Sequence, residues 1–365
     1  MMEAVRVGIG KSRRIGRPLR PGKTGPPPPE PPPPPEPPPP SEPPRRRGDW
    51  LRLYGWLAAI LAAVLVGGWI VFETGPPTEA QLREQARLTG EHARDKLYIG
   101  VKNDTPGIAE KDPVTGTFSG FDIDIAYMIA ADLGFRRDQV VFLSIKTEDR
   151  ARRQATDDRG NYVAVDLVVA TFSITRDRVR DASVGFSTPY LYTEQSVVTR
   201  NDHPAVSSLS QLAGEKVCTL GASTSESPLG KAGVETIPEK QISECFKGLA
   251  NKQYDAVSTD AAIMAGFVAR SKGAFVHHDI ALEKTEMWGV NTGTNTPLRT
   301  LVELALYRSY ADPQNTAWED AYDRHIRPLL AANPGVNVAQ SLQPCVKPPR
   351  IRRWPWERAL SSDGC

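Results

Sequence analysis

The residues best suited to chemistry lie in the stretch ATFSITRDRVR, residues 170–180. The apolar run VDLVVA leads into hydroxyls at Thr171, Ser173 and Thr175, which share one face if the strand continues. Arg178 follows within reach of that face, and a guanidinium binds a carboxylate or a phosphate through two parallel hydrogen bonds. The stretch is therefore a candidate anion site. On spacing alone, a catalytic site, a phosphate loop and a surface arginine beside a capped helix remain open.

Two further segments supply polar groups. GASTSES, residues 221–227, lies between an expected strand and an expected helix and offers backbone N–H groups to an anion. It is not a P-loop, because the Gly-Lys-Ser/Thr ending is missing. Asp260 follows the apolar run DAVST, where it could pair with an ammonium group or cap the next helix. These two interpretations of Asp260 are compatible.

Other reactive residues do not form a recognisable centre. Asp122 and Asp124 are two apart and do not face each other on a helix, and acids in a first turn complement the helix dipole. No CxxC occurs, and His277 and His278 are adjacent rather than spaced as ligands, so no metal is expected. No nucleophile and base are readable as a pair. The sequence predicts neither an enzyme nor a cofactor.

The elements that must position these residues alternate along the chain. Strands are expected at 97–101, 140–145 and 165–170, with helices at 119–134 and 147–155 between them. A second series follows, with strands at 215–220 and 254–259 and helices at 243–253 and 261–270. Two amphipathic helices, 298–312 and 318–330, come last. This alternation predicts an α/β protein of two lobes. The donors at 171–178 follow a strand end, where such sheets bind ligands.

The N-terminal third has a different organisation. Sixteen of the 33 prolines lie in residues 21–44, which predicts an extended or disordered tail, either a spacer or a docking site. Residues 53–72 are uncharged for twenty positions, enough to cross a bilayer. Arginines precede this run and Glu73 follows it, which predicts a cytoplasmic N-terminus and an extracellular remainder. A cleaved signal peptide is the alternative. Because the basic excess is confined to residues 1–52, no nucleic-acid partner is expected.

Four cysteines lie on the predicted outer side, where disulfides form. They allow three connectivities. We favour Cys218 with Cys245 and Cys345 with Cys365, because each pair then lies within one region.

In these segments, the chain resembles the extracellular solute-binding proteins of polar amino-acid ABC transporters, family 3. The resemblance covers about residues 96–333. It rests on GFDIDI (120–125), DLVVATFSITRDR, VGFSTPY (184–190), VCTLGASTS, YDAVSTDAA and the late WGV. ATFSIT and the cysteines of VCTL and SECF are most similar to the actinobacterial glutamate-binding branch. The resemblance implies a two-lobed type II periplasmic-binding fold, here preceded by a single transmembrane helix.

The resemblance also implies roles for particular residues. Arg178 corresponds to the clamp on the ligand's α-carboxylate, helped by Ser173, Ser223 and Thr224, and Asp260 to the acceptor of its α-ammonium. Ala170 or Thr171 would add a carbonyl or hydroxyl, although many members have glycine at Thr171. Lys102 stands where binders of acidic amino acids place a base, and Arg150 would assist it. Arg176 and Arg180 are expected to be solvated.

These inferences define six segments. They are a cytoplasmic tail (1–49), a transmembrane helix (50–73), a linker (74–96), lobe 1 (97–199 and 288–335), lobe 2 (200–287) and a C-terminal extension (336–365). Crossings between the lobes are expected near 199–203 and 284–288, where a hinge would let the ligand draw the lobes together. The predicted function is a membrane-anchored binding protein that delivers glutamate, or else aspartate or glutamine, to ABC permease subunits. An amino-acid sensor signalling through the tail and a dehydratase-like enzyme are the alternatives.

Overall fold

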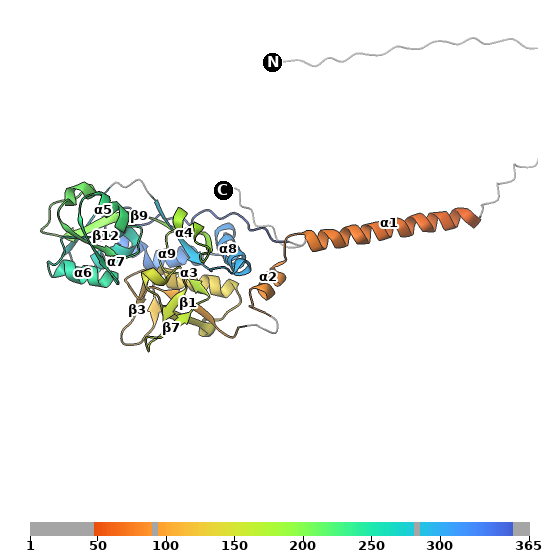
Figure 1. Cartoon of the computed structure of the whole chain (residues 1–365), viewed down its shortest axis with the longest axis horizontal. Coiled ribbons are helices and arrows are strands. Elements are labelled where there is room, and N and C mark those ends of the chain that lie inside the picture. Colours follow the sequence, from red (N-terminus) through yellow and green to blue (C-terminus); the bar gives the residue numbers. More distant parts are fainter. Residues whose placement is uncertain (1–46, 90–93, 281–284, 353–365) are drawn as a thin grey trace, which may run out of the picture. The chain divides into compact units, whose positions relative to one another are not determined.

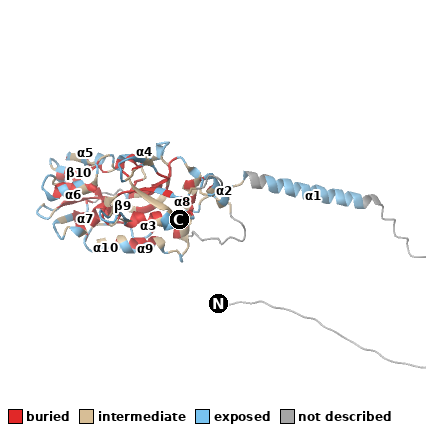
Figure 2. Cartoon of the chain, turned by 90° about the horizontal axis from the view of Figure 1, so that it is seen from below, coloured by how far each residue is buried: buried red, intermediate tan, exposed pale blue. Residues whose placement is uncertain are grey.

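The computed structural model describes residues 47–89, 94–280 and 285–352, and the chain divides into two compact units between Ile70 and Val71. The first unit contains most of helix α1 (Arg47–Thr74). In the described part of the chain, α1 is the one helix long and apolar enough to cross a bilayer, over Trp50–Trp69. Figure 2 shows its described side chains exposed. The predicted proline-rich tail, up to position 46, lies outside the described residues.

The second unit is built on one long mixed sheet with the strand order β11-β10-β12-β9-β14-β8-β1-β5-β6-β7, in which β13 also pairs with β9 (Figure 1). A separate small sheet has the order β2-β3-β4. The strands are β1 (Leu97–Val101), β2 (Asp104–Thr105), β3 (Ala109–Lys111), β4 (Phe118–Ser119), β5 (Val140–Ser144), β6 (Gln154–Thr156), β7 (Tyr162–Ala164), β8 (Leu167–Val168), β9 (Phe186–Arg200), β10 (Lys216–Leu220), β11 (Glu235–Glu239), β12 (Ala256–Asp260), β13 (Phe275–His278) and β14 (Thr285–Asn291).

Helices cover this sheet in two groups (Figure 1). The second unit contains α2 (Glu79–Gln85), α3 (Phe121–Asp132), α4 (Arg176–Arg180), α5 (Glu226–Lys231), α6 (Ile242–Ala250), α7 (Ala261–Arg270), α8 (Thr296–Ala311), α9 (Ala317–His325) and α10 (Arg327–Leu330), with single 3₁₀ turns η1 (Arg137–Gln139), η2 (Thr147–Asp149) and η3 (Leu209–Leu212). Lobe 1 comprises the parallel strands β1, β5 and β8 with α3, α8 and α9. Lobe 2 comprises the parallel strands β10, β11 and β12 with α5, α6 and α7.

Strand β9 connects the two lobes. Its residues 186–194 pair with β14, whereas residues 195–199 pair antiparallel with β12 of lobe 2. The chain therefore crosses at Glu194 and Gln195, several residues before the expected position at 199–203. The reason is that β9 continues unbroken into lobe 2, so the turn after Arg200 already belongs to that lobe. The return crossing is β14, which begins at Thr285; Lys284 lies outside the described residues.

The start of α3 illustrates how the sequence builds lobe 1. Gly120 precedes the helix with a φ of 130°, a region that side chains disfavour. A Cβ on Gly120 would also lie 2.3 Å from the carbonyl oxygen of Ile108. Phe121 is then fully buried and meets the ring of Trp318 from α9 edge-on. The apolar face of α3 is thus fixed against the last long helices.

Three expected elements differ in the structure. Residues 147–155 form η2 and strand β6 instead of a charged helix, because the side chain of Arg150 turns into the protein to bond backbone carbonyls. The predicted linker is not a free spacer, since α2 buries Leu82 in the core of lobe 1 and Glu79 pairs with Arg308 at 2.6 Å. The predicted final helix is divided into α9 and α10 close to Pro328.

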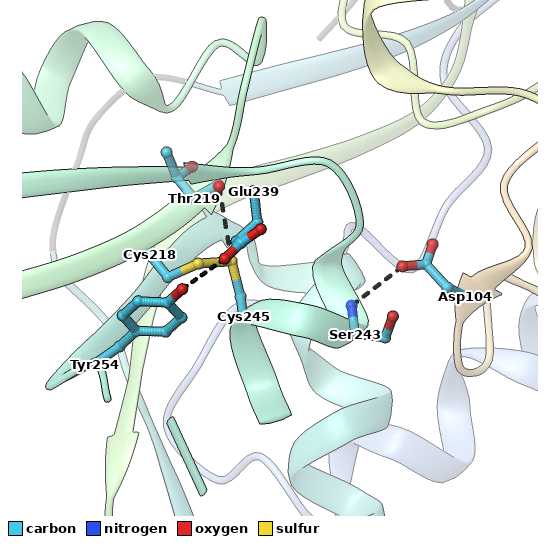
Figure 3. The surroundings of a disulfide bond; sticks show 7 residues. All are labelled: Asp104, Cys218, Thr219, Glu239, Ser243, Cys245 and Tyr254. Carbon is cyan, nitrogen blue, oxygen red and sulfur yellow. Dashed lines mark hydrogen bonds between the residues drawn. A yellow bond between two sulfur atoms is a disulfide. The ribbon is translucent and has the colours of Figure 1, made fainter. Parts of the chain in front are cut away.

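The predicted disulfide between Cys218 and Cys245 is confirmed. It joins β10 to α6 within lobe 2, with the two Cα atoms 5.5 Å apart (Figure 3). The second predicted pair includes Cys365, which lies outside the described residues.

Candidate functional site

The candidate site begins where β8 ends and the chain turns at Thr171. Thr171 has a φ of 47°, a left-handed conformation that costs a non-glycine residue about 1–3 kcal/mol unless its surroundings hold it. Asp122 at the start of α3 supplies one such restraint, because its Oδ2 accepts the backbone N–H of Thr171 at 3.0 Å. The other carboxylate oxygen accepts the hydroxyl of Tyr190 at 2.9 Å. Burial raises the pKa of Asp122 to about 7.

This role of Asp122 was not predicted. Its position in the first turn of α3 fits the helix-dipole interpretation, but its fully buried carboxylate acts on a residue 49 positions away. Asp124, by contrast, pairs with Arg324 and His325 of α9 within lobe 1.

Arg150 restrains the same turn from the other side. Its guanidinium Nη1 donates to the carbonyls of Ala170 at 3.1 Å and Thr171 at 2.7 Å. Burial, followed by the nearby charge of Arg178, lowers the pKa of Arg150 to about 9. The guanidiniums of Arg150 and Arg178 lie 4.8 and 4.7 Å from the ring centre of Phe172. Phe172 thus holds two cations close together through cation–π contacts.

Arg178 extends from lobe 1 to lobe 2. Its Nη1 donates to the carbonyl of Ser173 at 2.9 Å and its Nη2 to the carbonyl of Ala222 at 3.1 Å. The Thr175 hydroxyl caps α4 by accepting the N–H of Arg178 at 3.3 Å, which fixes the base of the side chain. Arg176 and Arg180 are exposed on the same short helix, as the sequence suggested. Of these three arginines, Arg178 is the one directed into the site.

Lobe 2 contributes the turn after β10. Ala222 has a φ of 58°, and Ser223 follows it with a backbone N–H bonded to Leu220. The Ser223 hydroxyl is buried without a hydrogen-bond partner among the described residues, and Thr224 is next in the same turn. Buried polar groups are normally paired, so this hydroxyl is available to a bound group.

Asp260 ends β12 and immediately precedes α7. Its Oδ2 accepts the indole N–H of Trp288 at 2.6 Å, and the carboxylate does not cap its own helix. Burial, followed by the nearby charge of Glu286, raises the pKa of Asp260 to about 7. Glu286 and Trp288 are two apart on β14 and so share a face. Sequence reasoning missed both residues, because they reach the site only through the pairing of β14 with β9.

Lys102 lies at another edge of the site and is 3% exposed. Its Nζ bonds the Thr147 hydroxyl at 3.3 Å. Burial lowers the pKa of Lys102 to about 8, an effect that Asp104 opposes and Arg150 reinforces. Beside Lys102 is a cavity of about 300 Å³ between the two lobes, lined by polar residues and lysines from both, including Lys111, Lys146, Lys240, Asn103 and Gln241.

The lobes are in contact around this site. Glu110 of lobe 1 forms two 2.6 Å bonds with Arg270 of α7. The backbone N–H of Ser243 donates to Asp104 at 3.1 Å close to the disulfide (Figure 3). Gln241 donates to Asn103 at 3.3 Å.

The structure therefore brings the predicted residues to one region between the lobes. Ala170, Thr171, Ser173 and Arg178 share direct contacts with Arg150 or with one another. Ser223 and Thr224 adjoin the carbonyl that Arg178 binds, and Asp260 is close enough to Arg150 and Arg178 to affect their pKa values. Among the described residues, no group of three or more His, Cys, Asp or Glu side chains could hold a metal. The arrangement suits a zwitterion, with donors for an anion and a carboxylate for a cation.

Comparison with known proteins agrees with this fold. The glutamate-binding protein GluB of Corynebacterium efficiens is 30% identical over 228 residues, which cover 59% of this chain and 74% of GluB. The ABC transporter glutamine-binding protein GlnH of Bacillus subtilis is 31% identical over 180 residues, covering 49% and 63% of the two chains.

Solved structures are also similar. An ancestral arginine-binding protein bound to glutamine is 28% identical with a TM-score of 0.56, covering 64% of this chain and 99% of that one. The cysteine-binding protein of Campylobacter jejuni has a TM-score of 0.58 at 20% identity, covering 70% and 95%, and supports the fold alone. The second unit has the two-lobed type II periplasmic-binding fold.

The family model named bacterial extracellular solute-binding proteins, family 3, matches residues 97–325, more than half of the chain. Its members are binding proteins, which agrees with the prediction that this chain is not an enzyme. The protein belongs to the bacterial extracellular solute-binding proteins of family 3.

Proposed function

We propose that this protein is a membrane-anchored extracellular receptor for an acidic amino acid, with glutamate as the first choice, and that it delivers its ligand to an ABC transporter. The observation that carries the proposal is the placement of Arg178 and Asp260 in one site between the lobes. Arg178 would bind the α-carboxylate together with Ser173, Ser223 and Thr224. Asp260 would accept the α-ammonium, with the carbonyl of Ala170 or Thr171 beside it.

The choice of ligand rests on the buried cations. Burial lowers the pKa values of Lys102 and Arg150, so nearby carboxylates only partly compensate their charged forms. A side-chain carboxylate on the ligand would complete this compensation. Among the relatives, GluB is named for glutamate and GlnH for glutamine, and aspartate or glutamine are the alternatives here.

Delivery would depend on movement of the lobes. Strands β9 and β14 would carry the predicted hinge, and Arg178 bonds residues of both lobes. A ligand held by Arg178 on one side and Asp260 on the other would favour the state in which the lobes touch. Contacts such as Glu110 with Arg270 would then add to closure.

Anchoring would be provided by α1. The helix has 28 residues, so it is about 42 Å long and exceeds a hydrocarbon core of about 30 Å. With its arginine-rich end in the cytoplasm, the second unit lies outside the cell, where a disulfide between Cys218 and Cys245 can form.

Isothermal titration calorimetry of the full chain in detergent, against the twenty amino acids, tests the proposal. We expect binding of glutamate, with at least about a hundredfold loss in Arg178→Ala and Asp260→Ala, since each leaves a buried charge unpaired. Arg180→Ala is the matched control, because Arg180 is exposed on the same helix. Absence of binding to any amino acid, or normal binding by both site variants, would show that the site is wrongly assigned.

The ligand side chain is tested separately with Lys102→Met. We expect this variant to weaken glutamate about tenfold more than glutamine, because only glutamate carries the second carboxylate. Lys146→Met, at an exposed lysine of the same cavity, is the control. An equal loss of affinity for glutamate and glutamine would show that Lys102 does not bind the side chain of the ligand.

A further inference from the structure

Residues 333–340, which we call the hinge strap, lie beyond the residues that match the family model. The strap contacts both lobes. Asn333 is 2% exposed and bonds α7 and β13 of lobe 2, through the carbonyl of Ala265 at 3.1 Å and the Nδ1 atom of His277 at 2.5 Å. Farther along, the carbonyl of Ala339 accepts the hydroxyl of Tyr322 from lobe 1 at 3.3 Å.

After Asn333, the strap runs beside β9 where that strand changes lobes. Three hydrogen bonds join them: the N–H of Gln340 to the carbonyl of Tyr192 at 3.0 Å, the hydroxyl of Thr193 to the carbonyl of Val338 at 2.7 Å, and the amide of Asn337 to the carboxylate of Glu194 at 2.6 Å. Val338 is 1% exposed at this contact. The same three β9 residues pair with β14. The crossing strand is therefore bonded to β14 and to the strap.

The hydroxyl of Thr193 has a second role. It accepts the backbone N–H of Ala262 at 3.2 Å, in the first turn of α7. The first N–H groups of a helix lack partners within the helix, and the residue before it usually caps them. Here that residue is Asp260, whose carboxylate bonds Trp288 and makes no cap. Thr193 replaces the missing cap and leaves the carboxylate of Asp260 free for another group.

We infer that the hinge strap is a positioning element of the binding site. It holds Thr193 through Val338, and Thr193 holds the start of α7 so that Asp260 presents its carboxylate to the cleft. The strap thus acts on the ammonium side of the site without touching the ligand. The inference rests on the proposed function, because it assigns a purpose to Asp260.

The test uses calorimetry with glutamate on the full chain. Thr193→Val removes the hydroxyl and both of its bonds, and we expect at least about a tenfold loss of affinity, the size of one or two hydrogen bonds. Thr193→Ser keeps the hydroxyl and should restore affinity to within about threefold of the unmodified chain. Asn337→Ala removes only the exposed bond to Glu194, so this variant should fold normally and give a smaller but measurable loss of affinity.

Two comparisons separate positioning from general stability. Gln343→Ala removes bonds to Leu306 and Ser309 of α8, just beyond the strap, and should leave affinity unchanged while lowering the melting temperature. In an Asp260→Asn background, Thr193→Val should cost less than about twofold, because coupled residues are not additive.

The outcomes are distinct. If the unmodified chain binds no amino acid, the proposed function fails. The positioning role is overturned if the unmodified chain binds glutamate and both Asn337→Ala and Thr193→Val bind it with the same affinity. It is also overturned if Thr193→Val lowers the affinity by the same factor with Asp260 and with Asp260→Asn.

Discussion

The carboxylate of Asp122 accepts the backbone N–H of Thr171 at 3.0 Å, at a point where the backbone adopts a left-handed conformation with a φ of 47°. Asp122 comes from the start of α3 and Thr171 from the end of β8, so the bond joins a helix to a strand end. The guanidinium of Arg150 donates to the carbonyl of Thr171 at 2.7 Å. The turn that carries Ser173 and leads to Arg178 is fixed from both sides.

Replacing Asp122 with alanine should therefore destabilise the protein. The change leaves the buried N–H of Thr171 and hydroxyl of Tyr190 without partners, at a cost of about 2–4 kcal/mol in the free energy of unfolding. Urea denaturation measures the loss. Asp122→Asn is the control, because an amide has an acceptor for Thr171 and a donor for the Tyr190 oxygen. A stable Asp122→Ala protein would show that the turn needs no such support.

Ligand binding should weaken in mild acid. Asp260 must be ionised to accept an ammonium group, and its pKa in the protein is about 7 rather than 3.8. As the pH falls below 7, protons compete with the ligand, so the Kd for glutamate should rise about tenfold per pH unit towards pH 5. Calorimetry from pH 5 to 8 measures this. The slope should be absent in Asp260→Asn and retained in Asp122→Asn; a flat profile in the unmodified chain would contradict the role of Asp260.

Contact between the lobes should require Gly266. A Cβ at this position of α7 would lie 2.0 Å from the carbonyl oxygen of Pro106 in lobe 1. Gly266→Ala should keep the lobes apart and reduce affinity by at least about tenfold, since overpacking costs 1–3 kcal/mol. Small-angle scattering with saturating glutamate should show a larger radius of gyration. Gly230→Ala in α5 of the same lobe is the matched control, because a Cβ at that position would have no neighbour within 4 Å. Unchanged scattering in Gly266→Ala would mean that binding does not need this contact.

Loss of the disulfide should destabilise lobe 2 without removing site residues. Cys218 and Cys245 are 27 positions apart, and closing a loop of that length is worth about 3–4 kcal/mol. The double serine variant should melt at a lower temperature, as should the reduced protein in dithiothreitol. Glutamate affinity at low temperature should stay within about threefold, because neither cysteine reaches the site. Equal melting temperatures with and without the bond would indicate that the reduced chain is already ordered there.

Much of this arrangement could be predicted from local patterns. The apolar runs at 97–101 and 215–220 became β1 and β10, and the helix at 261–270 became α7 almost residue for residue. The cysteine pair of lobe 2 was also accessible, because its two members lie in neighbouring elements. The strand-end position indicated a candidate anion site, and the family resemblance then selected Arg178 from its three arginines.

The predictions that failed concern residues whose contacts come from distant segments of the chain. The charged stretch around Arg150 has a helical composition, yet the carbonyls of Ala170 and Thr171 draw its side chain inward and the backbone turns instead. Asp122 looked like an ordinary helix-start acid because its partner is 49 residues away. Glu286 reaches Asp260 only through strand pairing. Each of these outcomes is set by tertiary packing, which no periodicity within one segment records.

The two ends of the folded domain also meet. The N–H of Arg352 bonds the carbonyl of Pro77 at 2.9 Å, and Thr78 pairs with Arg352, only four positions after α1 ends. With α1 in the bilayer as proposed, the four residues that follow α1 would form a linker of at most about 14 Å of extended chain between the membrane and the folded domain. Such a receptor would search a thin layer above the membrane rather than the surrounding fluid, and it would meet a transporter by diffusing laterally in the bilayer. Handover would then depend on how densely the two proteins are distributed in the membrane and on how they are oriented there.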